Sequence, residues 1–126
     1  MHKHLLRPER VRRIPNQFSW IDHRLVREGH IERCPAEACA LYLFLVTVAD
    51  ARGLSYYSDA AIARRLSMDE PRLHKARAAL LGADLLAYEP PLYQVLSMPQ
   101  PSLPESARRA RPRALSELLR NLGPDR

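Results

Sequence analysis

SDAAIARRLSMDEPRLHKARAALLG, residues 58–82, contains two short amphipathic helix patterns joined by the four residues 67–70. In the first pattern, Ile62, Ala63 and Leu66 fall on one side of a helical wheel. Because Ala63 is small, a following helix has room to cross close to the first. Two amphipathic helices with so short a connection predict a helix-turn-helix.

The second helix of this pair is predicted over residues 71–82. Its core-facing residues are Leu73, Ala76 and Leu80. Ser67 and Glu70 have the spacing of a capping box, and Pro71 is typical of a first helical turn. We therefore expect the chain to turn at residues 67–70 and enter the second helix at Pro71.

A longer helix is expected upstream, beginning near Pro35 and ending between Asp50 and Gly53, where Gly supplies the turn. Its apolar stripe consists of Ala38, Leu41, Tyr42, Leu45, Val48 and Ala49. Further apolar residues lie outside the stripe, at Leu43, Phe44 and Val46. The pattern therefore predicts a helix buried nearly all round, with Cys39 as a small core residue.

Short strands are predicted on either side of these helices. Residues 17–22 fit a strand with Phe18 and Trp20 on one face. Residues 23–31 are ambiguous and fit a short helix closed by a glycine. Residues 85–89 and 92–96 fit two strands joined at two prolines. The expected order is strand, helix, helix, helix and hairpin.

Charge divides the chain into a nearly neutral centre with basic ends. Lys and Arg total 20 and Asp and Glu 14 among 126 residues, a net charge of +6. Residues 1–15 carry +4, residues 16–98 carry −1 and residues 99–126 carry +3. We interpret 1–15 as a basic arm, 16–98 as the folded domain and the Pro-rich 99–112 as an extended linker. The basic surplus favours a polyanionic partner, nucleic acid first.

Residues 17–97 resemble the winged-helix domains of plasmid and phage replication initiators and of DnaD-like primosome proteins. The positions that carry the resemblance are Ala40 to Leu45, Ala49, Asp50, Gly53, Tyr57, Ser58, Ile62, Ala63, Leu66, Ala76, Arg77, Leu80 and Leu85 to Tyr88. The resemblance implies a mainly α winged helix-turn-helix with a small β-hairpin. It also implies binding of double-stranded DNA in replication initiation, mobile-element function or transcriptional regulation.

The resemblance makes residues 71–82 the recognition helix, which enters the major groove. The residues expected to reach base edges or phosphates are Arg72, His74, Lys75 and Ala78. Arg64 and Arg65 belong to the preceding helix, and we expect one of them to contact a phosphate. Arg77 lies at the edge of the apolar stripe, so we favour an internal ion pair with Asp50 or Asp59 over a DNA contact.

Two features depart from a typical DNA-binding winged helix. Asp69 and Glu70 stand at the front of the recognition helix, where capping and dipole complementarity explain them. Residues 85–98 contain no Lys or Arg, so we expect the hairpin to contribute to packing of the sheet and not to bind phosphates. We therefore expect the two basic flanks to supply the affinity for DNA. The alternative is that these flanks are only solvated tails. The flanking candidates are Arg10, Arg12, Arg13, Arg108, Arg109 and Arg111.

Residues 113–122 form a short amphipathic pattern beyond the linker, with a leucine stripe at Leu115, Leu118, Leu119 and Leu122. A helix of this length is marginal alone, so it either docks on a protein partner or a second copy, or remains an idle tail. This stripe supports an alternative function. The chain would then be an adaptor whose winged helix and C-terminal leucines bind a protein.

Other function classes find little support. Cys34 and Cys39 lack a zinc-binding spacing, so we expect no metal site and no cofactor. No phosphate-binding glycine loop or catalytic motif is present, and we expect a protein that is not an enzyme. The longest apolar run, residues 38–49, is too short to span a bilayer, and the N-terminus lacks the apolar core of a secretory signal. The expected location is the cytoplasm, in association with the nucleoid.

Overall fold

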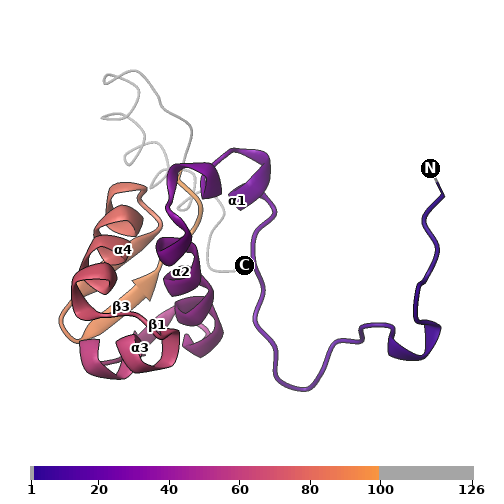
Figure 1. Ribbon diagram of the computed structural model, residues 1–126, viewed down its shortest axis with the longest axis horizontal. Helices are drawn as coiled ribbons and strands as arrows, with labels where there is room; N and C mark the ends of the chain where they lie inside the picture. The colour runs from indigo at the N-terminus through magenta and orange to yellow at the C-terminus, as the bar shows by residue number, and fades with distance from the viewer. Residues whose placement is uncertain (1, 100–126) are drawn as a thin grey trace, which may run out of the picture.

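The computed structural model describes residues 2–99 and shows a helical domain with a small antiparallel sheet (Figure 1). Its helices and strands are α1 (Arg24–Arg27), α2 (Ala36–Val48), β1 (Leu54–Tyr56), α3 (Asp59–Leu66), α4 (Glu70–Gly82), β2 (Leu86–Glu89) and β3 (Leu92–Val95), with single 3-10 turns at Pro8–Arg10 and Ile31–Arg33. This mainly α architecture is the expected one, and it is consistent with a winged helix. No helix within residues 2–99 is both long and apolar enough to cross a bilayer.

The core lies where α2, α4 and the sheet meet. Its largest fully buried side chains are Tyr93, Leu41, Leu45, Ile62, Leu73, Leu80 and Leu85. Every inward-facing residue predicted on α4 is buried, and so is Ile62 of α3. The helical periodicity therefore identified the face of each helix that packs.

The turn between α3 and α4 differs from the expectation. Ser67 ends α3 in the left-handed region, with φ 54°, rather than capping α4. Asp69 is the N-cap of α4, and its carboxylate accepts a hydrogen bond from the backbone N–H of Arg72 at 2.8 Å. The capping-box prediction at Ser67 was wrong, because the acid two residues later reaches the same helix end.

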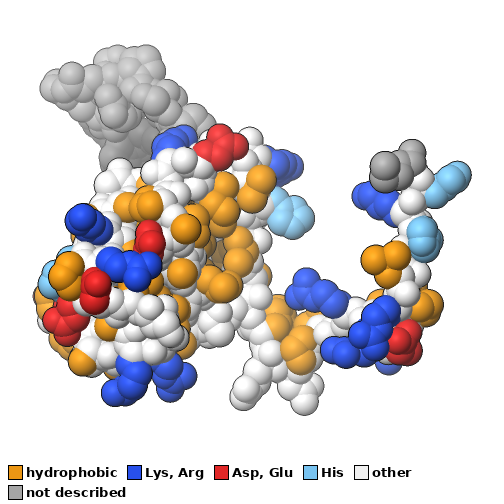
Figure 2. Space-filling model, in the orientation of Figure 1, with side chains coloured by type: hydrophobic (Ala, Val, Ile, Leu, Met, Phe, Trp, Pro, Cys, Tyr) orange, Lys and Arg blue, Asp and Glu red, His pale blue; other side chains and the backbone are white. Residues whose placement is uncertain are grey.

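The α2 helix is buried on one side only. Ala38, Leu41, Tyr42 and Leu45 are buried, whereas Leu43 is 58% exposed. The prediction of burial nearly all round was therefore wrong, and Cys39 is only partly buried. The exposed side borders an apolar hollow of about 190 Å³, lined by Ile21, Leu25, Ile31, Cys34, Cys39, Tyr42, Leu43, Leu80 and Leu85. Hydrophobic side chains gather around it in Figure 2.

The sheet contains a strand, β1, that was not predicted from the sequence. Its order is β1-β3-β2, so β3 lies in the centre and pairs antiparallel with both neighbours. The strand predicted at residues 17–22 is absent, because this segment pairs with none of the three strands. Phe18 and Trp20 are 63% and 74% exposed, so neither ring provides the burial that would hold a strand on the sheet.

The turn before β1 depends on a glycine. Gly53 has φ +86°, and its carbonyl accepts a hydrogen bond from the N–H of Val95 at 2.8 Å. Asp50 holds the same turn, because its carboxylate accepts hydrogen bonds from the backbone N–H groups of Arg52 and Leu54 at 2.8 and 3.0 Å. These hydrogen bonds lower the pKa of Asp50.

Replacing Gly53 with Ala should lower the free energy of unfolding by about 1–3 kcal/mol. A Cβ at this position would lie 2.6 Å from the carbonyl oxygen of Val95, and the left-handed backbone is strained for Ala. Urea unfolding measures the change. Gly82→Ala is the matched control, because a Cβ there meets nothing within 4 Å and helix propensity favours Ala. Equal stability of both variants would contradict the role assigned to Gly53.

Candidate nucleic-acid interface

The exposed sides of α3 and α4 carry most of the predicted contact residues of the folded domain. Arg64 and Arg65 are exposed in the last turn of α3, and Lys75 and Ala78 are exposed on α4. Within residues 2–99, neither of these arginines nor Lys75 forms an ion pair. In Figure 2, basic side chains project at the lower end of the domain, beneath α3.

The other two predicted contact residues of α4 are engaged by acids of the protein itself. The Arg72 guanidinium donates to the Glu37 carboxylate of α2 at 3.0 Å, and this contact lowers the pKa of Glu37. His74 Nε2 lies 3.1 Å from the Asp59 carboxylate of α3. Both pairs are partly exposed, so a competing anion can reach them.

Arg77 is the structural arginine that the sequence analysis favoured, and its partner is Asp59 rather than Asp50. The guanidinium donates to the Asp59 carboxylate and to the Tyr93 hydroxyl, each at 2.8 Å. It also lies over the Tyr88 ring, 4.3 Å from the centroid, and the rings of Tyr88 and Tyr93 stack at 4.5 Å. A single side chain therefore joins α3, α4 and the sheet.

The ionisation of this cluster follows from the same contacts. The hydrogen bond from Arg77, together with the one from His74, holds the pKa of Asp59 below its ordinary value of 3.8, against the opposing effect of burial. Burial raises the pKa of Tyr93 to about 12, so its hydroxyl stays neutral at physiological pH. The cluster therefore contains a carboxylate shared between an arginine and a histidine of the same helix.

As expected, an acid caps the start of α4 and the hairpin packs against the core. Asp69 caps the helix, and Glu70 is exposed in the first turn. The hairpin formed by β2 and β3 has Tyr93 buried at its centre, and its tip is Pro90 and Pro91. It therefore presents aromatic and apolar groups to the core and no cation at its tip.

The basic arm is exposed along all its described residues. Arg7 pairs with Glu9 at 3.0 Å, whereas Arg10, Arg12 and Arg13 form no ion pair within residues 2–99. Figure 1 shows the arm running away from the domain, on the side of α2 opposite to α4. The remaining predicted site residues lie outside the described part of the chain: Arg108, Arg109, Arg111, Leu115, Leu118, Leu119 and Leu122.

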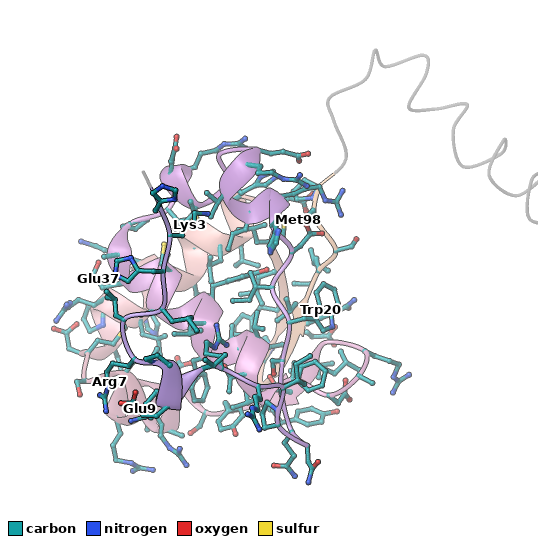
Figure 3. All side chains as sticks on the ribbon, turned by 90° about the vertical axis from the view of Figure 1, so that its right-hand side faces the viewer. Lys3, Arg7, Glu9, Trp20, Glu37 and Met98 are labelled. Carbon is teal, nitrogen blue, oxygen red and sulfur yellow. The ribbon has the colours of Figure 1, made fainter. Side chains whose placement is uncertain are left out.

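A second hollow of the domain was not anticipated from the sequence. Phe18 and Trp20 line a groove of about 550 Å³, and Arg52 and Gln94 are among the other residues that line it. We call this the aromatic groove. Figure 3 shows Trp20 and Met98 on the same side of the domain, and both line the groove. The alternation of the two aromatic residues is visible in the sequence, where it predicts one face of a short strand and not the wall of a groove.

Comparison with known proteins assigns no family to this chain. A scan against protein-family models finds no match, and a search of curated proteins finds none. Among solved structures, the chain is similar to one described as "Structure of Rep-DNA complex". The two are 14% identical with a TM-score of 0.47, and the similarity covers 81% of this chain and 89% of the other.

Replacing Asp59 with Asn should lower the free energy of unfolding at neutral pH by about 1–3 kcal/mol, because Arg77 loses its charged partner. The folded-state pKa of Asp59 is depressed, so this contribution is present above the ordinary value of 3.8 and is lost as the pH falls through the lower folded value. Urea unfolding at neutral pH and well below pH 3.8 should therefore show the two proteins converging in acid.

The matched control for this prediction is Glu9→Gln. Glu9 also pairs with an arginine, but both side chains are more than 60% exposed, so its loss should have almost no effect on stability. A destabilisation by Asp59→Asn that stays constant across the pH range would show that the charge of Asp59 is not what stabilises the cluster.

Proposed function

We propose that this chain is a DNA-binding protein that contacts duplex DNA through α3 and α4 and gains affinity from its basic arm. The observation that carries the proposal is the set of exposed cations on α3 and α4 without an acidic partner in the described chain, namely Arg64, Arg65 and Lys75. Cations left free on adjacent helices of a helix-turn-helix are positioned for phosphates and base edges.

We propose that Arg72 and His74 contact DNA only after they leave their partners within the protein. Each is held by an acid of the domain, Arg72 by Glu37 and His74 by Asp59. Because these pairs are partly exposed and therefore weak, a phosphate can replace the carboxylate. We propose that Lys75 makes the first contact from α4, and that Arg72 and His74 exchange partners once DNA is present.

The basic arm is proposed to supply affinity that does not depend on sequence. It carries +4 over residues 1–15, whereas residues 16–98 carry −1. The release of counterions from phosphates makes such binding steeply dependent on salt. The cations beyond residue 99 are proposed to act in the same way. We propose no catalytic step for this protein, and we place its use in replication initiation, mobile-element function or transcriptional regulation.

One observation favours the alternative of a protein-binding adaptor. The apolar hollow beside Leu43 lies open on the domain surface, and exposed apolar patches often mark protein contacts. In this alternative the C-terminal leucines are proposed to contribute to binding a partner or a second copy. The two functions differ in their response to salt and to charge reversal on α4.

Reversing the charge of Lys75 to Glu should weaken binding to a labelled random-sequence duplex by about 5- to 150-fold, because α4 loses its free cation and gains an acid. Fluorescence anisotropy of the full chain measures the affinity. Arg27→Glu is the matched control, since Arg27 is an exposed cation on α1 and does not belong to the exposed sides of α3 and α4. No loss from Lys75→Glu would favour the adaptor, whereas equal losses from both variants would mean that duplex binding depends on net charge and not on α4.

Replacing Arg10, Arg12 and Arg13 together with Ala should flatten the salt dependence of duplex binding. If about six cations engage the full chain, log affinity falls with log salt at a slope of roughly −5, and the triple variant should reduce that slope by about three. Titrations at several salt concentrations give the slope. An unchanged slope would mean that the arm is a solvated tail.

A further inference from the structure

We infer that the aromatic groove is a binding site for single-stranded DNA, in which Phe18 and Trp20 stack on unpaired bases. This inference rests on the proposed DNA-binding function and assigns a second kind of nucleic acid to a different surface. No residue of the groove belongs to the exposed sides of α3 and α4. The two surfaces can therefore be tested independently.

The two aromatic rings are the first observation. Phe18 and Trp20 are 63% and 74% exposed, and both face the same groove although one residue separates them in the chain. The intervening Ser19 ties this segment to α2, because its hydroxyl donates to the carbonyl of Thr47 at 3.4 Å. Exposed rings held at the edge of a groove offer flat faces on which bases stack.

The chemistry of the groove is the second observation. Its wall combines the apolar Val46 and Val95 with hydrogen-bonding groups at Gln94 and Ser97. Its volume of about 550 Å³ lies within the usual range for small-ligand sites, about 300–1,000 Å³. The combination suits a nucleobase, which has an apolar face and polar edges.

Charge is the third observation. The groove contains two acids, and both are occupied by internal hydrogen bonds. Asp22 receives the Arg24 guanidinium at 2.7 Å, and Asp50 receives the two backbone N–H groups of its turn. Arg52 is exposed at the rim without an ion pair in the described chain. Together with the arginines of the arm, which lead into Phe18, it provides cations for the phosphates.

The geometry favours a single strand over a duplex. Bases in a duplex are already stacked on each other, and their faces are not available to a side chain. The groove offers rings and no helix that could enter a major groove, whereas α4 lies on the other side of α2 (Figure 1). A protein that reads duplex DNA with α4 can therefore hold an unpaired strand on its opposite side.

The test uses the fluorescence of Trp20, which is the single tryptophan of the chain. Titration of the full chain with a short oligothymidylate should quench this fluorescence saturably, because a base stacks on the indole. Phe18→Ala should weaken that binding by about 5- to 150-fold, since one stacking contact is lost, and should leave duplex binding unchanged. Phe18 is exposed, so this variant should melt at the same temperature as the original protein.

Tyr56→Ala is the matched control, because Tyr56 is 70% exposed on β1 and does not line the groove. It should leave binding of the oligothymidylate unchanged. Absence of quenching, or equal effects of Phe18→Ala and Tyr56→Ala, would overturn the inference. Lys75→Glu separates the two proposals. If it weakens duplex binding while the oligothymidylate fails to bind, only this inference fails. If the oligothymidylate quenches Trp20 while no duplex binds, the role assigned to α3 and α4 fails instead.

Discussion

The way in which α3 and α4 pack together depends on the contacts of Arg77. Its guanidinium is nearly buried and is satisfied from three directions, by the Asp59 carboxylate, the Tyr93 hydroxyl and the face of Tyr88. A buried cation without these partners would be costly, so α3, α4 and the sheet have to assemble together. The angle at which α4 presents Lys75 to solvent is therefore set by a contact on its opposite side.

The sequence predicted the helices well because their signals are local. Apolar spacing located the buried faces of α3 and α4, and Asp59 was one of two acids named as partners of Arg77. One error is local, because Asp69 and not Ser67 caps α4, but the larger errors are non-local. Whether Phe18 and Trp20 join a sheet depends on whether their segment pairs with an edge strand of the folded sheet, and whether Leu43 is buried depends on what covers α2. Neither question can be answered from the spacing of residues along one segment.

The candidate site was predictable only in part, for a related reason. The exposure of Lys75 and Ala78 followed from the helical wheel, but the partners of Arg72 and His74 did not. Those partners come from α2 and α3, and finding them requires the crossing angles of the helices. The aromatic groove likewise consists of segments that are far apart in the sequence.

The pairing of Arg72 with Glu37 and of His74 with Asp59 has a consequence for how α4 would select a target. Each carboxylate pairs with a side chain that the proposed function assigns to DNA, and therefore competes with a phosphate for that side chain. Under the proposed function, replacing a carboxylate by a phosphate adds little binding free energy, because one anion is exchanged for another. Binding becomes favourable only where the DNA contacts Arg72 and His74 better than Glu37 and Asp59 do. A helix that worked in this way would select DNA by competition between anions. It would hold poorly matched DNA for a short time, and nonspecific attraction would come from the described cations that have no acidic partner, such as Arg10, Arg12 and Arg13.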